Sequence, residues 1–352
     1  MKKPAKLADV ARAAGVSQGT ASNVFNRPEL VRLEVRTKVA DAARQLGYGG
    51  PDPKGKLLRA GKVNAIGVVV HERLGVFLDD PSNVIMLAGI GEVCDHKGAG
   101  MALISAYPED ETPAWSIKSA VVDGFIVFCL ESGDRLIEET RKRNLPFVAI
   151  DFDAGADVST VAADDYGGAR MAAEHLVALG HRRFAALSLE LSGDGHFGPV
   201  DAERRRAARY STTRARLGGW TDALAAVGVD MDSVPIMEVL NDRGSARQAA
   251  GELIAANPQV TAILTMSDVM ALGALDCAHA MGIVVPDRLS IIGFDDIPQV
   301  SAAAPPLTTV RQPTRAKGRL AAELMFDRGP PRREILPVEL VVRESTAPPR
   351  FR

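Results

Sequence analysis

The segment from Val16 to Asn26 reads VSQGTASNVFN and brings amide and hydroxyl side chains together at short spacing. Asparagine and glutamine can bond the edge of an adenine through a paired donor and acceptor, whereas hydroxyl groups can bond phosphate oxygens. The spacing is typical of the second helix of a helix-turn-helix, which lies in the major groove of DNA. Duplex DNA is therefore a candidate partner, and Gln18, Gly19 and Asn23 are the positions to consider at the base pairs.

Two carboxylates stand at the ends of apolar runs in the body of the chain. Asp151 closes PFVAID, and Asp295 closes IIGFD. A carboxylate at the end of a parallel strand can accept hydrogen bonds from paired hydroxyls, which is a common way to hold a polyol or a sugar. The alternative for Asp295 and its neighbour Asp296 is a structural role in capping and subdomain packing.

Residues for catalysis or metal binding do not gather in the sequence. The glycine pairs in LAGIGE and HKGAGM lack the longer dinucleotide or phosphate-loop signatures, and suit turns and helix packing instead. The cysteines are far apart, which favours buried thiols in a reducing compartment. The cysteines and histidines are not spaced as metal ligands: Cys94, Cys129, Cys277, His71, His96, His175, His181, His196 and His279. No metal, cofactor or enzymatic activity is therefore expected.

Three short amphipathic helices are predicted near the N-terminus. Residues 7–14 carry apolar side chains at the helical spacing i, i+3, i+4 and i+7. Gly15 permits a tight turn, and Ser17 can cap a second helix over residues 18–25. A third apolar stripe follows in residues 33–46, so the three helices can bury one common core.

A short link separates these helices from the body. In residues 50–62, Asp52 can cap and Pro53 can start a helix that runs through Leu58. Gly55 in its middle costs about 1 kcal/mol against alanine, and so short a helix is marginal in water. The link is therefore expected to become helical only when another surface stabilises it.

Charge is unevenly divided along the chain. Residues 1–62 hold thirteen lysines and arginines against five acidic residues, a net charge of +8, and the remainder carries −10 within a total of −2. A small basic module on a large acidic body indicates that only the module approaches a polyanion.

From Val63 onward, apolar strands alternate with helical patterns. The first strands are AIGVVV, GMALIS, GFIVF and PFVAID, and a later set includes VPIMEV, TAILTM and LSIIGF. Such alternation predicts parallel sheets with helices on their faces. The 352 residues suffice for two or three folded domains. No uncharged apolar run reaches the roughly 18 residues of a membrane span, so a cytoplasmic protein is expected.

The ordered set of motifs resembles the LacI/GalR family of bacterial transcription regulators. The resemblance rests on LADVARAAGVSQGTASNVFN, VRTKVADAARQLGY, the Pro-Asp…Leu-Leu link, MSDVMALGAL, VPDRLSIIGFDDI and PPLTTVRQP, and it continues to near residue 345. It implies an α/β fold class with an N-terminal all-α module. The module is a helix-turn-helix DNA-binding headpiece, and the body is a periplasmic-binding-protein-like type I core of two doubly wound α/β subdomains.

The resemblance also implies domain boundaries. The DNA-binding domain is expected at 1–49, the hinge helix or linker at 50–62, and the effector-binding and dimerisation core at 63–352. Within the core, the first subdomain is expected at about 63–162 and 294–326, and the second at about 163–293 and 327–345.

Roles for headpiece residues follow from the same resemblance. Gln18, Gly19 and Asn23 fall at the family's base-reading positions. The positions that match contacts with the DNA backbone or packing at the hinge are Ser17, Thr20, Ser22, Asn26, Arg36 and Tyr48. A solvated or capping side chain is the alternative for each, and capping is expected of Ser17 in addition.

Some headpiece positions depart from the family's pattern. Asn23 stands where the family commonly has arginine, and because arginine pairs with guanine and asparagine with adenine, the preferred base should change there. Gly19 has no side chain to read with, so it either allows close approach to the DNA or leaves its base unread. Arg32 stands where a serine often caps the third helix, so it exchanges a cap for a phosphate contact.

In the hinge, Leu58 matches the leucine that family dimers wedge into the minor groove, where it helps to kink the duplex. Leu57 is the alternative wedge, because the pair Gly49-Gly50 makes the hinge one residue longer.

In the core, the resemblance implies a sugar-like small-molecule effector between the subdomains. Arg216 matches the family's effector-binding arginine. The full set of expected effector-binding residues is Asp151, Arg216, Asp295, Thr212, Asn241 and Phe128. Residues 192–214 run longer than in many relatives and form either a lid whose arginines meet an anionic effector or, as charge runs usually do, a solvated basic helix.

The expected function is sequence-specific transcriptional regulation, with repression as the expected direction. A homodimer would present two headpieces to a palindromic operator in double-stranded DNA, and the effector would shift the subdomains. The chain lacks a leucine heptad tail, so a dimer is expected rather than a tail-mediated tetramer, located in the cytoplasm at the nucleoid and without a membrane partner. The alternative is a cytoplasmic small-molecule-binding protein or enzyme with a vestigial DNA-binding module, and salt-dependent, sequence-specific duplex binding distinguishes the two.

Overall fold

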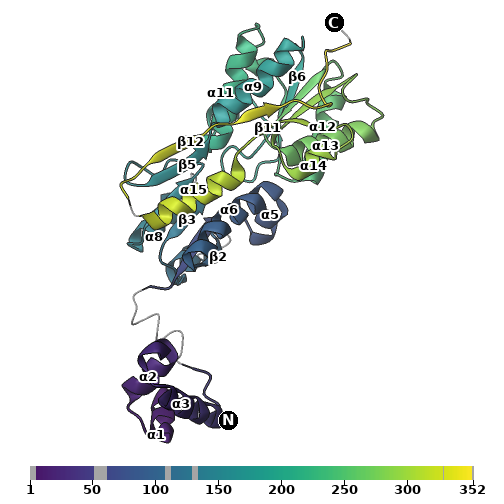
Figure 1. Cartoon of the computed structure of the whole chain (residues 1–352). Coiled ribbons are helices and arrows are strands. Elements are labelled where there is room, and N and C mark those ends of the chain that lie inside the picture. Colours follow the sequence, from purple (N-terminus) through teal and green to yellow (C-terminus); the bar gives the residue numbers. More distant parts are fainter. Residues whose placement is uncertain (1–4, 51–61, 108–111, 129–133, 328, 351–352) are drawn as a thin grey trace. The chain divides into compact units, whose positions relative to one another are not determined.

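The computed structural model describes residues 5–50, 62–107, 112–128, 134–327 and 329–350 (Figure 1). It divides into two compact units, Met1–Val63 and Asn64–Arg352. The predicted hinge helix, with Leu57 and Leu58, lies outside the described residues. Within the described ranges, no helix is both long enough and apolar enough to cross a membrane.

The smaller unit is helical. It contains α1 (Leu7–Ala14), α2 (Gln18–Asn26), the short 3-10 helix η1 (Pro28–Leu30) and α3 (Leu33–Leu46). The three predicted helices are thus confirmed, and α2 is one residue longer than expected. Gly15 ends α1 with a φ of 65°, the left-handed conformation that a glycine adopts without strain.

One small core holds the three helices together. Its buried side chains are Val10, Ala11, Ala21, Val39, Ala42 and Ala43. Ala11 and Ala21 are small, which lets α1 and α2 pack at the steep angle of the turn. At the rim, the rings of Phe25 and Tyr48 meet edge to face at 5.6 Å, so Tyr48 fastens the end of the unit to α2.

The larger unit consists of two α/β halves, and the first is built on one parallel sheet. Within the described residues its strand order is β12-β5-β4-β3-β1-β2. The elements are β1 (Ala65–Val70), α5 (Leu74–Asp79), α6 (Pro81–Lys97), β2 (Gly100–Ser105), α7 (Thr112–Ser119), β3 (Phe125–Phe128), α8 (Asp134–Lys142), β4 (Phe147–Ile150), β5 (Ser159–Ala163), α15 (Thr314–Asp327) and β12 (Arg333–Leu336). Separate apolar clusters cover its two faces, as the apolar strands predict.

The second half has the strand order β13-β11-β10-β9-β6-β8-β7 within the described residues. Its elements are α9 (Asp165–Ala178), β6 (Phe184–Ser188), β7 (Gly198–Pro199), α10 (Ala202–Arg206), α11 (Ser211–Ala225), η2 (Met231–Ser233), β8 (Ile236–Glu238), α12 (Arg243–Ala256), β9 (Ala262–Thr265), α13 (Asp268–Ala280), β10 (Ser290–Asp295), α14 (Pro298–Ser301), β11 (Thr308–Arg311) and β13 (Glu339–Val341). The edge strands β7 and β13 are antiparallel, and the inner strands are parallel. One continuous apolar cluster fills this half.

The chain passes between the two halves after β5, after β11 and after β12. We expected residues 294–326 in the first half and 327–345 in the second. The structure differs from this expectation at two strands. β11 pairs with β10 in the second sheet, and β12 pairs with β5 in the first. The crossings therefore fall near residues 312 and 337 rather than at 294 and 327.

Two helices of the first half are locked together through glycines. A methyl group on Gly89 of α6 would lie 2.0 Å from the carbonyl oxygen of Arg315, and one on Gly318 of α15 would lie 2.2 Å from that of Met86. Figure 1 shows α6 and α15 running side by side. Because backbone meets backbone at both glycines, α6 and α15 behave as one rigid layer. The helix-packing role predicted for LAGIGE is confirmed at Gly89, whereas a methyl group on Gly91 would meet nothing within 4 Å.

Candidate nucleic-acid interface and ligand site

The outer face of α2 carries the three expected base-reading positions. Gln18, Gly19 and Asn23 are exposed, while Ala21 between them is buried in the core of the helical unit. A methyl group on Gly19 would meet only the Oγ of Ser17, at 3.7 Å, which is an ordinary contact. The fold of the unit therefore does not require glycine at this position, and all three residues are available to an external partner.

Hydroxyl and amide groups flank this face in short local hydrogen bonds. The Oγ of Ser17 accepts from the backbone N–H of Thr20 at 3.0 Å, so the predicted cap of α2 is confirmed. The Nδ2 of Asn26 donates to the carbonyl oxygen of Ser22 at 3.1 Å and to its Oγ at 3.2 Å. These bonds orient the side chains while leaving spare donors on the exposed surface.

Two arginines of the same unit lie at α3. Arg32 occupies its N-cap position, and its side chain makes no capping hydrogen bond, as its departure from the family pattern predicts. Arg36 is half-buried, and its Nε is buried without a hydrogen-bond partner among the described residues. A guanidinium in this condition is suited to an acceptor from outside the chain, such as a phosphate oxygen.

In the larger unit, polar residues collect where strands of the two sheets end. Asp151 follows β4 with a φ of 62°, and its Oδ2 accepts a hydrogen bond from the Nζ of Lys317 at 2.6 Å. Its other oxygen, Oδ1, is buried and has no partner among the described residues. A buried carboxylate oxygen without a donor loses its hydration uncompensated, so it is a place where a ligand hydroxyl would be stabilised.

Asp295 ends β10 in the second half with a φ of 126°. Its Oδ1 accepts from the Nε2 of Gln312 at 2.5 Å. Loss of hydration raises the pKa of Asp295 well above its usual value, against the lowering effect of the positive charge of Arg216. The neighbouring Asp296 pairs with Arg311 and Arg343, which gives it the structural role considered as the alternative.

Arg216 lies at the centre of this region and is 4% exposed. Its Nε donates to the Oδ1 of Asp165 at 2.8 Å, and its Nη1 donates to the carbonyl oxygen of Met266. The guanidinium also stacks 3.7 Å from the centre of the Phe294 ring. Asp165, which sequence reasoning missed because it lies 51 positions away, is thus the counterion of Arg216.

The remaining expected ligand residues have different settings. Thr212 has a buried Oγ1 without a partner among the described residues. Asn241 donates to the Oδ2 of Asp80 at 2.9 Å and accepts from the Oγ of Ser267 at 2.6 Å. Phe128 packs edge to face on Phe77 at 5.9 Å, against the core of the first half.

Carboxylates outnumber cations around these residues. The pKa of Glu72 is raised to about 7, first by loss of hydration and then by the charges of Asp80 and Glu190. Glu72 is exposed, so water screens part of this effect. Glu190 belongs to the second half and Glu72 to the first, so acidic groups of both halves lie within electrostatic range. The sequence did not predict that Glu72, Asp80 and Glu190 lie close together, because Glu190 is far from the other two in the chain and the three form no motif.

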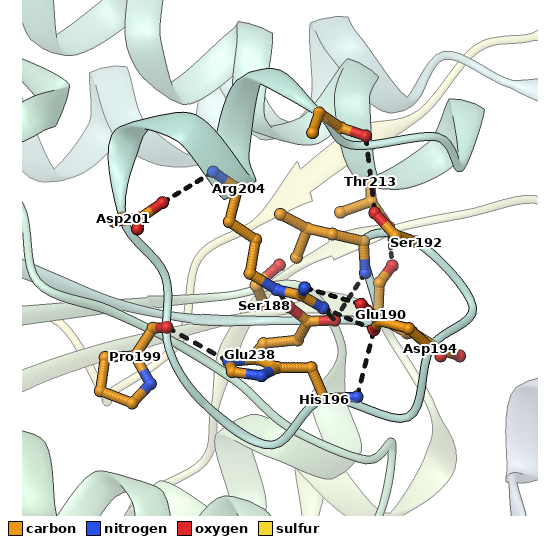
Figure 2. A network of polar contacts seen from close by, with 12 residues as sticks. Ser188, Glu190, Ser192, Asp194, His196, Pro199, Asp201, Arg204, Thr213 and Glu238 are labelled. Carbon is orange, nitrogen blue, oxygen red and sulfur yellow. Dashed lines mark hydrogen bonds and ion pairs between the residues drawn. The ribbon is translucent and has the colours of Figure 1, made fainter.

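Residues 192–214 are tied to the second sheet by one arginine (Figure 2). The Nε of Arg204 donates to the Oε2 of Glu238 at 2.5 Å, and its Nη2 donates to the Oδ1 of Asp194 at 2.7 Å. Glu238 is fully buried at the end of β8. Arg205 pairs with Asp232. Both arginines are mostly buried in ion pairs within the second half, so the expectation of a solvated basic helix is wrong for these two residues.

Two hydrogen bonds, from Gly195 and Thr213, hold Glu190 in place. The backbone N–H of Gly195 donates to the Oε1 of Glu190 at 3.0 Å, and the Oγ1 of Thr213 donates to its carbonyl oxygen at 3.0 Å. Figure 2 shows Glu190 beside Arg204 and Asp194. Residues 192–214 thus stabilise the second half by binding residues of its strands and loops.

No metal site accompanies these groups. Among the residues that the structure describes, no set of three or more histidine, cysteine or acidic side chains could hold a metal ion.

Comparison with known proteins covers nearly the whole chain. Residues 6–50 match the model of bacterial regulatory proteins of the lacI family, and residues 173–346 match a periplasmic binding protein-like domain. An HTH-type transcriptional regulator of Mycobacterium tuberculosis is 36% identical over 359 residues, spanning 99% of this chain and 98% of the relative.

Solved structures show the same likeness. The Lac repressor dimer bound to operator and the anti-inducer ONPF has a TM-score of 0.78 at 27% identity, covering 98% of this chain and 100% of that one. The complex of the transcriptional regulator CelR with cellobiose has a TM-score of 0.70 at 29% identity, covering 97% and 99%. The chain belongs to the lacI family of bacterial regulatory proteins, as a transcriptional regulator with a helix-turn-helix DNA-binding domain and a ligand-binding domain.

Proposed function

We propose that the protein is a dimeric repressor that binds a palindromic operator and responds to a neutral sugar or sugar derivative held between the two halves of its larger unit. The observation that carries the ligand part is the pair of buried, unpartnered oxygens, Oδ1 of Asp151 and Oγ1 of Thr212. One belongs to each half, and the hydroxyls of a polyol could satisfy both.

On the DNA side, Gln18 and Asn23 read base edges and Gly19 allows close approach. Ser17, Thr20, Ser22, Asn26, Arg36 and Tyr48 set the register on the DNA backbone, and Leu58 or Leu57 enters the minor groove. The exposure of the first three and the unpartnered Nε of Arg36 support these roles. Similarity to a Lac repressor bound to operator supports the mode of binding.

Charge supports a neutral ligand rather than an anionic one. Arg216 and Lys317 already have counterions in Asp165 and Asp151. A phosphate or carboxylate on the ligand would have to compete with Asp165 and Asp151 for these two cations. Arg204 and Arg205 do not change this balance, because both pair with acidic residues of the second half.

For the dimer, the first half offers an apolar surface beside an open sheet edge. β2 is the edge strand, and α5 and α6 contact it. The exposed apolar side chains there are Leu74, Val76, Leu78, Val84, Met101 and Tyr107. A cluster of this kind on a folded surface marks an interface, and a second copy related by a two-fold axis would present both headpieces to the two half-sites of a palindrome.

The DNA part is tested by selecting ligands from a pool of random duplexes. We expect a palindromic consensus whose affinity falls steeply with salt. A selection that yields no consensus, or binding equally tight to all duplexes, contradicts the proposal.

Sedimentation of Val76→Glu against wild type tests the dimer, with loss of the dimer as the expected result.

The ligand part is tested by thermal shift with matched sugars. We expect neutral sugars such as glucose or cellobiose, or a neutral polyol, to raise the unfolding temperature by mass action, and glucose 6-phosphate to have no effect. Stabilisation by the phosphorylated sugar alone would contradict the charge argument. Addition of the stabilising compound to the selected duplex complex should then release the DNA.

A further inference from the structure

Three side chains form a continuous hydrogen-bonded bridge between the two halves. The Nδ2 of Asn241 donates to the Oδ2 of Asp80 at 2.9 Å, and the Oγ of Ser267 donates to the Oδ1 of Asn241 at 2.6 Å. Asp80 belongs to the first half, whereas Asn241 and Ser267 belong to the second. The bridge joins residues 161 positions apart, so no local interaction in the chain enforces it.

Each end of the bridge also caps a helix. The Oδ1 of Asp80 accepts from the backbone N–H of Ser82 at 2.8 Å at the start of α6, and the Oγ of Ser267 accepts from that of Met270 at 3.2 Å at the start of α13. Side chains that cap helices have little rotational freedom. The bridge therefore connects two rigid points rather than two mobile side chains.

The first of these points moves with the whole first half. Gly89 and Gly318 hold α6 against α15 at backbone contact distance, and α15 packs on the sheet. A displacement of Asp80 relative to Asn241 thus requires the two halves to move against each other. Conversely, any movement that separates the two halves at this point breaks the bond between Asp80 and Asn241.

The bridge lies in the same electrostatic environment as the candidate ligand site. Burial raises the pKa of Asp80, and bonds from Ser82 and Asn241 together with the charge of Arg216 lower it. Asp80 in turn contributes to the raised pKa of Asp295, after desolvation and Asp268. Asn241 is itself one of the expected ligand-binding residues, and its amide keeps a second hydrogen and a second lone pair for a ligand.

We propose that the Asp80–Asn241–Ser267 bridge is a latch that holds the two halves in the arrangement that binds DNA, and that the ligand acts on DNA affinity by altering this latch at Asn241. The DNA part rests on the proposed function, whereas the latch itself rests only on the geometry. The Lac repressor dimer bound to operator, with its TM-score of 0.78, supports assigning the observed arrangement to the DNA-binding state.

Asp80→Ser separates the latch from the helix cap. Serine is a good N-cap, so α6 keeps its cap, but its side chain is too short to reach Asn241. Asp80→Asn is the rescue variant, because flipping the amide of Asn241 lets Asn241 accept from the new side chain and donate to Ser267. Asp242→Ser is the matched control, since Asp242 caps α12 next to Asn241 through Gly244 and Ser245 and takes no part in the bridge.

The opening of the halves is measured by pulsed dipolar spectroscopy on the full-length protein. Spin labels at Lys97→Cys on α6 and Gln248→Cys on α12 report the distance between the halves, in a background with Cys129→Ser. The other two cysteines are buried. Loss of a charge-assisted hydrogen bond should increase the open population about tenfold. We expect longer distances in Asp80→Ser, and the wild-type distribution in Asp80→Asn and Asp242→Ser.

The same four proteins are then titrated against the duplex that the wild type selects. We expect Asp80→Ser to bind it more weakly, with the apparent Kd rising by the factor by which its closed fraction falls in the distance measurement, and the other two variants to bind like wild type. If Asp80→Ser shows the wild-type distance distribution, the latch is overturned. If Asp80→Asn opens as far as Asp80→Ser, charge rather than the bridge holds the halves, and the latch is again overturned. If the wild type selects no duplex, the proposed function and the coupling to DNA both fail, and the distance measurement alone decides the latch.

Discussion

The polar side chains of α2 and those between the two halves of the larger unit have opposite environments. Ser17, Thr20 and Asn26 bond to residues three or four positions away and remain at the surface. Arg216 and Lys317 are buried and bond to carboxylates 51 and 166 positions away. The polar face of α2 is formed by a single helix, whereas each buried pair forms only when segments far apart in the chain have folded together within one half.

This contrast predicts where mutations act. A change on α2 should alter DNA binding and leave stability nearly unchanged, because exposed side chains contribute little to folding. A change among the buried pairs should alter both ligand binding and stability, because a lost partner leaves a charge in a poorly hydrated place.

The largest effect is expected for Arg216→Ala. It leaves the Asp165 carboxylate buried without its counterion, which costs roughly 3–5 kcal/mol of unfolding free energy. Chemical denaturation of the larger unit measures it. Arg170→Ala, which removes an exposed pair with Glu174, is the control and should cost about 0.5 kcal/mol or less. If both variants lose the same unfolding free energy, the buried pair contributes no more to stability than an exposed one, and the contrast between the two regions is wrong.

The second prediction concerns pH and Asp268. This fully buried residue has its pKa raised from 3.8 to about 7, chiefly by desolvation. A carboxyl whose folded pKa is raised contributes stability that is complete below its unfolded pKa and is lost as pH rises through its folded pKa. Between about pH 4 and pH 7 the wild type should lose roughly 2–4 kcal/mol through this group.

Asp268→Asn lacks this titration, so its free energy of unfolding should depend less on pH. The difference between wild type and variant should favour the wild type most at about pH 4 and below, and shrink as the pH rises to about 7. The bonds of Asp268 to Thr309 and to the backbone of Ile297 are lost or weakened at every pH and shift only the baseline. Parallel pH profiles would contradict the raised pKa.

Asn23→Arg should change the operator and not the fold. Because arginine pairs with guanine and asparagine with adenine, we expect the preferred base to change at one symmetric pair of positions, with roughly 1–3 kcal/mol of discrimination. Selection from random duplexes with both proteins measures it. The unfolding temperature serves as the control and should stay constant, since Asn23 is exposed. An unchanged consensus would show that Asn23 does not read a base.

A small loss of stability, confined to the helical unit, is expected for Ser17→Ala. Loss of the cap on the N–H of Thr20 should cost about 1 kcal/mol in the helical unit. Thermal unfolding of the full chain and hydrogen exchange of the backbone amides of α2 measure this loss. Ser17→Asp keeps a capping oxygen and should keep the stability while weakening DNA binding, because its charge repels phosphate. A loss of stability in both variants would contradict the capping role.

The same contrast explains how much the sequence could predict. The bounds of α1, α2 and α3 follow from apolar spacing and from glycines and caps within a few residues, and the alternation of strands and helices predicts the doubly wound halves. The sheets to which β11 and β12 belong cannot be predicted from the spacing of residues in the sequence. The expected subdomain boundaries were therefore wrong at these two strands. Asp80, Asp165 and Lys317 were missed for the same reason, because their partners are distant in the chain.

The three passages of the chain between the halves set an order for synthesis. The helical unit is complete once residue 63 has left the ribosome, and it can fold first. The first sheet, by contrast, waits for β12 at Arg333–Leu336, and the pair between Asp151 and Lys317 waits nearly as long. A nascent chain therefore carries a finished DNA-binding domain before its ligand-binding domain is complete, and a product truncated between the two would keep the first without the second.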